Sequence, residues 1–464
     1  MFDRNRALKW LRKGVLLFGS TLLFHLLASG IAQAADPTGI DTLLGDPGAP
    51  VDYIWVAMSA FLVFIMQAGF AMLEGGLTRA KNTTNLMLKN IMDFSMCSLA
   101  YMAIGFAFMF GASKAGLIGS TGWFLLGDTY DVGTYLLFLF QVMFAGTAAT
   151  IASGAVAERM RWRAYFVYSI VVGAVIYPIF GHWVWGGGWL STLPLGVGHV
   201  DFAGSGVVHT IGGIVGLTGT MVLGPRFGKY INGKPRAIPG HSISMAALGC
   251  FLLWFGWFGF NAGSTLSAHE LRIAVVSVNT SMAAAAGAFA AMLFTWIKTK
   301  KPDASMTING AIAGLVAITA SCAWIEGWAA VIIGLVAGIL VVPSVYFFDR
   351  IGIDDPVGAI SVHAVNGVWG LLSVGLFADG TYGLYTTAAP HVVGLFYGGG
   401  FGQLAAQAVG AVVCIVWAFV LGYILFKSID KFIGMRVSPQ EELEGLDLSE
   451  HGTRAYPNFP YLEG

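Results

Sequence analysis

The chain has 464 residues, of which 56% are hydrophobic and only 11% are charged. Soluble domains carry about 25% charged residues, so this composition excludes an ordinary soluble domain and indicates a protein that lies in lipid. The formal net charge of zero gives no bulk attraction to nucleic acid. The four cysteines lie in apolar stretches without metal-ligand spacing, and we expect them to be buried small hydrophobic residues.

The first 34 residues are typical of a secretion signal. A basic head precedes an apolar run from Val15 to Ile31, and Ala32-Gln33-Ala34 matches the A-x-A cleavage pattern. An uncleaved helix is the alternative, and both interpretations place residues 36–50 outside the membrane. We therefore expect a signal peptide at 1–34, a membrane domain at 35–429 and a cytoplasmic tail at 430–464.

Eleven apolar segments follow the signal, and most reach the about 20 residues that a helix needs to cross a bilayer. The segment at 307–324 is the shortest and is rich in Gly and Ala. The expected spans are 52–74, 85–111, 133–157, 162–184, 204–224, 241–262, 271–297, 307–324, 327–348, 356–378 and 400–427. The sequence thus predicts an all-α polytopic membrane protein with eleven transmembrane helices.

The charges of the loops test this count independently. Outside the signal, 20 of the 25 Lys and Arg remain. If the first span starts outside and the spans alternate, 18 of them fall on the inner side, and only Lys114 and Arg272 fall outside. This distribution agrees with the positive-inside rule and places the C-terminal tail in the cytoplasm.

Two segments of the chain resemble each other. Asp201–Leu217 and Asp355–Leu371 are identical at seven of 17 positions and share the spacing D-x7-H-x3-G-x2-G-L. The first segment lies in the fifth span and the second in the tenth, so the two run in opposite directions. This indicates an inverted repeat of five plus five helices with an extra eleventh. Transporters commonly have this symmetry, with the solute site near the midplane.

The repeat contains a pair of histidines, His209 and His363. Each is followed by Gly at i+4 and i+7, which lie on the same helical face. Glycines on that face permit close helix packing, so each imidazole should point inward and the two rings should be neighbours. A structural core histidine is the alternative, but an ionisable residue inside a membrane is a functional candidate by default.

Several motifs resemble the ammonium transporter/methylammonium permease/Rhesus family, on its ammonium-transporter side, from about residue 50 to the end. They are DFAGSGVVH at 201–209, WFGWFGFNAGS at 254–264, HWVWGGG at 182–188, DDP at 354–356 before His363, and GLDLSEHG at 445–452. The resemblance implies eleven helices, a periplasmic N-terminus and a homotrimer in the inner or plasma membrane. It also implies one pore in each protomer and a role in nitrogen uptake.

The same resemblance implies an outer vestibule that recruits ammonium, an aromatic gate, and a narrow apolar pore lined by the two histidines. The matching residues are Trp185, Ser264, Phe144 and Asp201 near the recruitment site, Phe260 at the gate, His209 and His363 in the pore, and Trp257, Leu73 and Ala148 along the pore lining.

Two positions depart from the family pattern. Some members carry a second gate Phe where this chain has Ala148, so we expect a single gate ring, Phe260. Some members read Phe-Tyr-Gly-Gly where this chain has Leu73-Glu-Gly-Gly76, which places Glu74 near the cytoplasmic end of the first span.

Ammonium differs from potassium because it can lose a proton and become neutral. Aromatic rings at the mouth can hold the cation over a π face, at about 0.5–2 kcal/mol, and Ser264 can accept an N–H bond. Beyond Phe260 a charge costs about 3 kcal/mol at mid-membrane. The histidine pair can bind ammonia and relay a proton, because imidazole titrates near neutral pH. Asp201 could attract cations, although an N-cap of the fifth helix is the alternative.

Other residues have weaker assignments. The acidic tail is expected either to be solvated or, from the resemblance, to pack on neighbouring subunits and dock a PII-type signalling protein, with Ser449 as a possible phosphosite. Asp93 is an intramembrane carboxylate with no partner that the sequence can name. Five further histidines at span ends or in loops are expected to be solvated: His182, His199, His241, His269 and His391.

Three functions compete at this point: an ammonium transporter or channel, an ammonium sensor that uses the same site, and an ion-coupled transporter of another small solute. No signalling domain follows residue 430, and the histidine-bearing spans look continuous, which favours the first. No hydrolytic triad, P-loop or metal cluster appears, so we expect neither an enzyme nor a cofactor. Whether ammonium, ammonia with a proton, or ammonia alone crosses stays open.

Overall fold

The computed structural model describes residues 36–384 and 389–456, so the expected signal peptide lies outside the described residues. Within them, ten helical segments are long and apolar enough to cross a membrane. These are α3 (Ala49–Leu77), α4 to α5 (Ala80–Phe110), α6 (Val132–Ala155), α7 to α8 (Trp162–Val184), η6 with α9 (Ser205–Leu223), α10 with η7 (Ile243–Thr265), α11 (Ile273–Thr299), α13 (Gly327–Arg350), η8 with α14 (Ile360–Phe377) and α15 (Gly402–Phe432).

The remaining predicted span is the shorter apolar helix α12 (Ala304–Ile318), which packs between α11 and α13. The prediction that this span would be short is confirmed. It ends near residue 318, six residues before the predicted end, because residues 319–324 continue as turns. All eleven predicted segments therefore contain a helix, as the predicted fold class required.

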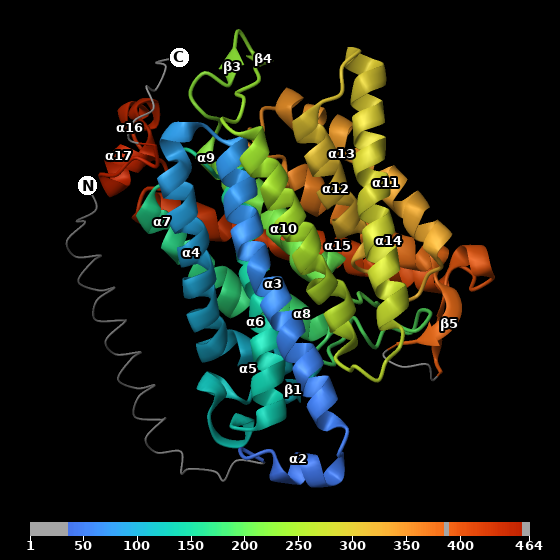
Figure 1. Cartoon of the computed structure of the whole chain (residues 1–464). Coiled ribbons are helices and arrows are strands. Elements are labelled where there is room, and N and C mark those ends of the chain that lie inside the picture. Colours follow the sequence, from blue (N-terminus) through green and yellow to red (C-terminus); the bar gives the residue numbers. More distant parts are fainter. Residues whose placement is uncertain (1–35, 385–388, 457–464) are drawn as a thin grey trace.

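The short elements lie at the two ends of the helical bundle (Figure 1). At one end, which we call the α2 end, are α2 (Ile40–Gly45) and the pair β1 (Ser113–Lys114) and β2 (Ile118–Gly119). At the other, which we call the tail end, are β3 (Tyr230–Ile231), β4 (Lys234–Pro235), α16 (Pro439–Glu444) and α17 (Leu446–His451). The antiparallel pair β5 (Asp379–Gly383) and β6 (His391–Val393) follows α14.

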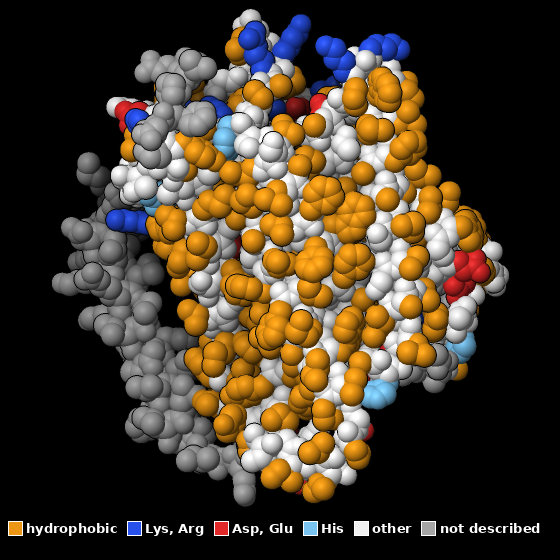
Figure 2. Space-filling model, viewed as in Figure 1, with side chains coloured by type: hydrophobic (Ala, Val, Ile, Leu, Met, Phe, Trp, Pro, Cys, Tyr) orange, Lys and Arg blue, Asp and Glu red, His pale blue; other side chains and the backbone are white. Residues whose placement is uncertain are grey.

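The outer surface matches a lipid environment. Figure 2 shows hydrophobic side chains over the face that α3, α10 and α11 form, while Lys and Arg gather at the tail end. Exposed aromatic rings on two of these helices include Phe61 and Phe64 of α3, and Phe251 and Phe255 of α10. By contrast, α6 and α9 are buried along most of their length. All four cysteines are buried, as the sequence predicted.

Glycine is abundant because it lets the helices approach closely. A Cβ at Gly76 of α3 would lie 2.4 Å from the carbonyl oxygen of Ser242, and one at Gly249 of α10 would lie 2.4 Å from the backbone nitrogen of Leu73. Neither distance leaves room for a side chain, so α3 and α10 pack backbone against backbone.

The described part of the tail, up to residue 456, packs on its own chain. The Asp447 carboxylate accepts the backbone N–H of Asn85, at 2.9 Å, at the start of α4 (Thr83–Ala100). The Glu450 carboxylate accepts the Asn85 side-chain amide and the backbone N–H of Trp162, each at 2.9 Å. These contacts hold α17 against α4 and the start of α7 (Trp162–Val171), so this part of the tail is not a freely solvated segment.

Candidate functional site

The two histidines meet at the centre of the bundle. His209 lies in η6 (Ser205–Thr210) and His363 in η8 (Ile360–Val365), both π-helical stretches. Their Nδ1 atoms are 3.2 Å apart, and the rings lie nearly parallel with centroids 5.2 Å apart. The prediction that the two imidazoles are neighbours is confirmed. One Nδ1–H must donate to the other Nδ1, so the neutral pair shares a single proton across this contact.

Repeat-related glycines bring the two histidine helices together. A Cβ at Gly213 would lie 2.4 Å from the backbone nitrogen of Ala364, and one at Gly367 would lie 2.4 Å from the carbonyl oxygen of Ser205. Gly213 is therefore required where α9 (Ile211–Leu223) crosses η8, and Gly367 is required where α14 (Asn366–Phe377) crosses η6. This is the close packing that the shared spacing predicts.

Asp201 and Asp355 begin these two helices in the same way. The Asp201 carboxylate accepts the backbone N–H groups of Gly204, Ser205, Gly206 and Val207 at 2.8–3.0 Å. The Asp355 carboxylate accepts those of Val357, Gly358 and Ile360. Burial raises the pKa of Asp201, and these four N–H donors oppose that rise. Asp201 thus accepts the N–H three residues on, as the capping alternative expected, although the N-cap residue itself is Gly204, and both carboxylate oxygens are occupied by backbone.

Aromatic rings cover the α2 side of the histidine pair. His209 stacks on Trp257 and on Phe260, with ring centroids 5.0 and 5.4 Å away. Phe260 in turn stacks on Phe144, with centroids 4.0 Å apart. Phe144 of α6 (Val132–Ala155) thus supplies a second ring at this level from its own position, although residue 148 is Ala. The expectation that Phe260 is the single gate ring stays a prediction.

The residues assigned to recruitment surround the Phe144–Phe260 stack. Trp185 meets Phe144 edge to face at 6.2 Å, and its Nε1 donates to the carbonyl oxygen of Asp201 at 2.7 Å. The Ser264 hydroxyl donates to the carbonyl oxygen of Phe260 at 2.8 Å. Both residues are only partly buried, whereas Phe144 and Phe260 are fully enclosed. The stack therefore separates a polar, accessible mouth from the histidine pair.

On the tail side, His363 opens into a cavity. Its walls include Phe70, Leu73 and Glu74 of α3, together with Asn309, Ile312, Val357 and His363. Leu73 thus lines the same cavity as His363, and its assignment to the pore stays a prediction. The carbonyl oxygen of Ala148 lies at the contact between α6 and α9, 2.7 Å from the position that a Cβ at Gly212 would take, and the assignment of Ala148 to the pore lining stays a prediction.

Comparison with known proteins agrees with this geometry. The model of the family described as "Ammonium Transporter Family" matches residues 54–456. The chain belongs to the ammonium transporter family. It is 56% identical over 436 residues to ammonium transporter Amt2 of Archaeoglobus fulgidus, covering 92% of this chain and 93% of that protein. It is 40% identical over 422 residues to ammonium transporter 3 of Dictyostelium discoideum, covering 88% and 94%.

Solved structures of similar fold include a protein described as "Sensor Amt Protein". The match has a TM-score of 0.80 and 40% identity, and it covers 88% of the present chain and 100% of the chain in that structure. Mep2 from Candida albicans matches with a TM-score of 0.78 and 31% identity, covering 88% and 90%.

This ammonium transporter family member also contains buried polar groups that the sequence could not pair. The Asp93 carboxylate accepts the hydroxyls of Tyr165, at 2.5 Å, and Thr150, at 3.0 Å, inside the bundle. His182 and His199 are buried, so the expectation that they are solvated is wrong for both. His182 is held between the carbonyl oxygen of Met109 and the hydroxyl of Ser113. Burial lowers the pKa of the His199 imidazole to about 4.

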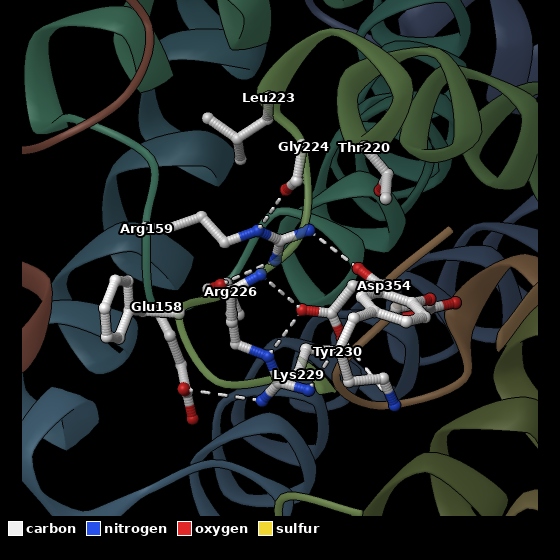
Figure 3. Close-up of polar contacts among 12 residues, drawn as sticks. Glu158, Arg159, Thr220, Leu223, Gly224, Arg226, Lys229, Tyr230 and Asp354 are labelled. Carbon is white, nitrogen blue, oxygen red and sulfur yellow. Dashed lines mark hydrogen bonds and ion pairs between the residues drawn. The ribbon is translucent and has the colours of Figure 1, made fainter. Parts of the chain in front are cut away.

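An ion-pair cluster joins the two repeat halves at the tail end (Figure 3). The Arg226 guanidinium binds both carboxylate oxygens of Asp354, each at 2.9 Å, and also lies 3.4 Å from Glu158. Arg159 donates to the backbone carbonyls of Gly224 and Asp354. Burial alone would raise the pKa of Asp354, but the Arg226 hydrogen bonds and charge outweigh it and hold that pKa well below its usual range. The end of α9 is thereby tied to the segment that begins η8.

Proposed function

We propose that this protein moves ammonium across its membrane by recruiting the cation at the aromatic mouth, deprotonating it there, and passing ammonia and a proton by the histidine pair. The observation that carries the proposal is the contact between the Nδ1 atoms of His209 and His363, 3.2 Å apart. It is enclosed by stacked rings on one side and opens to a cavity on the other.

The surroundings of the pair explain how ammonium would be distinguished from potassium. Phe144, Phe260 and Trp257 offer a π face but no full charge, so a cation loses its hydration without an ionic partner. Ammonium avoids this cost by losing a proton at the mouth and entering as neutral ammonia, whereas potassium has no proton to lose. The Nε2 atom of His209 is buried without a partner among the described residues, so it is free to bind ammonia.

The proton moves past the same histidine pair, but separately from ammonia, from one imidazole to the other. A proton that reaches His209 can move to His363 through their shared hydrogen bond, because imidazole accepts at one nitrogen and releases from the other. Transport is then electrogenic, since one positive charge crosses for each ammonia.

Currents from proteoliposomes on a solid-supported membrane test the proposal. Ammonium pulses at several pH values should give transient positive currents that potassium pulses of the same concentration do not give. The absence of any ammonium current would contradict electrogenic transport and would favour neutral ammonia conduction or sensing.

An ammonium sensor is the second candidate, and one observation favours it: the similar structure described as "Sensor Amt Protein" is 40% identical over its whole length. A sensor would bind ammonium at the same mouth. Equilibrium binding of ammonium without flux in the same proteoliposomes would support sensing over transport.

The orientation and assembly belong to the same proposal. We place the tail end in the cytoplasm of a cell that carries the protein in its plasma or inner membrane, as a homotrimer with three pores. The gathering of Lys and Arg at that end supports this orientation. Ser449 is exposed on α17, and a phosphate there would add about two negative charges beside Glu450 and loosen the docked tail, or displace a PII-type partner.

A further inference from the structure

The cavity on the tail side of His363 holds a carboxyl group that the proposed pathway has not used. Glu74 lies in the last turn of α3, its side chain is buried, and it lines the same cavity as His363, Phe70 and Leu73. We propose that Glu74 is the proton acceptor at the tail-side mouth of the pore, and that it returns the proton there to ammonia. This inference rests on the proposed function and extends it.

The hydrogen bonds of Glu74 leave one side of the carboxyl group available. Its Oε2 accepts from the Ser153 hydroxyl at 2.6 Å and from the Asn90 amide at 3.1 Å. Its Oε1 has no hydrogen-bond partner in the described part of the chain, and no cation of the described residues forms an ion pair with the group. The two donors fix the carboxyl group in place while one oxygen stays free to exchange a proton.

The charged and titratable groups around Glu74 do not neutralise it by contact. Lys89 and Asp93 on α4, and Asp355 before η8, act on it electrostatically, and His363 faces it across the cavity. The Lys89 ammonium is committed to the carbonyl oxygen of Met160 at 2.7 Å. Burying an acid without a contacting cation costs free energy, and in a membrane such groups mark proton paths.

A purely structural role is the alternative. Glu74 connects α3 with Asn90 of α4 and Ser153 of α6, and these bonds could tie three helices together. Both bonds, however, need only an acceptor oxygen, which a glutamine also has. These hydrogen bonds therefore do not explain why the residue is an acid. The cavity that Glu74 shares with His363 gives the acid a role in proton transfer.

The proton balance needs no further reactant. At the mouth on the α2 side one N–H bond of ammonium breaks, and the released proton passes to the histidine pair. An N–H bond of His363 then breaks as an O–H bond forms on Glu74, directly or through water in the cavity. Finally this O–H bond breaks as ammonia gains its fourth N–H bond and leaves as ammonium. One ammonium enters and one leaves, and Glu74 returns to its starting state.

The test compares Glu74→Gln with wild type in proteoliposomes, with two signals from each ammonium pulse. Current reports charge movement, and alkalinisation of the lumen above that of protein-free liposomes reports ammonia flux. We expect Glu74→Gln to lose at least tenfold in current while lumen alkalinisation rises above that of wild type, because ammonia then arrives without its proton. Glu74→Asp keeps an acid in the cavity and should retain at least a third of the current.

One further variant serves as a matched control. Glu444→Gln removes an exposed carboxylate on α16, far from the cavity lining, and should stay within threefold of the wild-type current. A Glu74→Gln current within twofold of wild type overturns the inference, as does a loss of current without a rise in lumen alkalinisation. If wild type itself gives no ammonium current, it is the proposed function that fails.

Discussion

The two repeat-related segments, Asp201–Leu217 and Asp355–Leu371, share a backbone plan but have different surroundings. Each begins with an aspartate cap, continues as a π-helical stretch with a histidine, and crosses the other at a glycine. His209, however, is enclosed by Trp257 and Phe260, whereas His363 lines a cavity with Glu74.

The residues just before the two caps differ as well. His199 and Val200 precede Asp201, while Ile353 and Asp354 precede Asp355. The first segment therefore carries a buried neutral imidazole at its start, and the second carries a buried ion pair with Arg226. The repeat gives the two histidine helices the same backbone geometry, whereas the neighbouring helices give the two sides of the histidine pair different chemistry. A pathway that takes up a proton at one end and releases it at the other requires such a difference.

Changing either histidine to aspartate should have the largest effect. His209→Asp and His363→Asp each replace half of the shared hydrogen bond by a fixed carboxylate, which stabilises a bare cation in the pore. We expect ammonium-over-potassium selectivity to fall at least tenfold in both, measured as currents from paired ammonium and potassium pulses. His391→Asp, which changes an exposed histidine of β6, is the control and should keep wild-type selectivity. Unchanged selectivity in both pore variants would remove the pair from the mechanism.

Breaking the buried ion pair between Asp354 and Arg226, just before the second segment, should cost the most stability. Asp354→Asn removes the carboxylate that Arg226 binds through two nitrogens, and loss of one partner of a buried pair costs about 3–5 kcal/mol. The measurement is the free energy of unfolding of the detergent-solubilised protein. Asp349→Asn is the matched control, because the Asp349 side chain is partly exposed and the buried Lys229 also lies 3.9 Å from Asp354, so its loss should be clearly smaller. Equal losses would show that burial of the Arg226 pair contributes nothing extra.

Blocking the crossing that the segments share tests their symmetry. Gly213→Val and Gly367→Val each place side-chain atoms against backbone at the helix contact, and such overpacking costs about 1–3 kcal/mol. We expect similar losses of stability from the two, measured as shifts in thermal unfolding. Gly45→Val in α2 is the control, since nothing lies within 4 Å of a Cβ there. A loss confined to one of the two variants would show that the crossing is not symmetric.

Acid should weaken the start of the first segment through His199. Burial lowers the pKa of His199 to about 4, below its unfolded value of about 6.5. Its contribution is therefore complete above pH 6.5 and is lost as the pH falls toward 4, because only the unfolded state then binds the proton. Between pH 7.5 and 5.0 wild type should lose about 2 kcal/mol more stability than His199→Gln. Parallel pH profiles for the two proteins would contradict the buried neutral imidazole.

The sequence by itself determined most of the fold and the centre of the site. Apolar length predicted eleven helices, and each is present. The repeated spacing predicted adjacent imidazoles on close-packed helices, because glycine at fixed intervals on one face dictates which face a partner helix can approach. These features depend on positions within one segment, so they could be read along the chain.

Contacts between distant segments were decided only by the tertiary structure. The stacking of Phe144 on Phe260, the hydroxyls that satisfy Asp93, the burial of His199 and the cavity that joins Glu74 to His363 each involve helices far apart in the chain. Such contacts depend on how each helix is rotated and where it crosses its neighbours, and a shift of one helical position would change them without altering the hydrophobic pattern that predicts the helices.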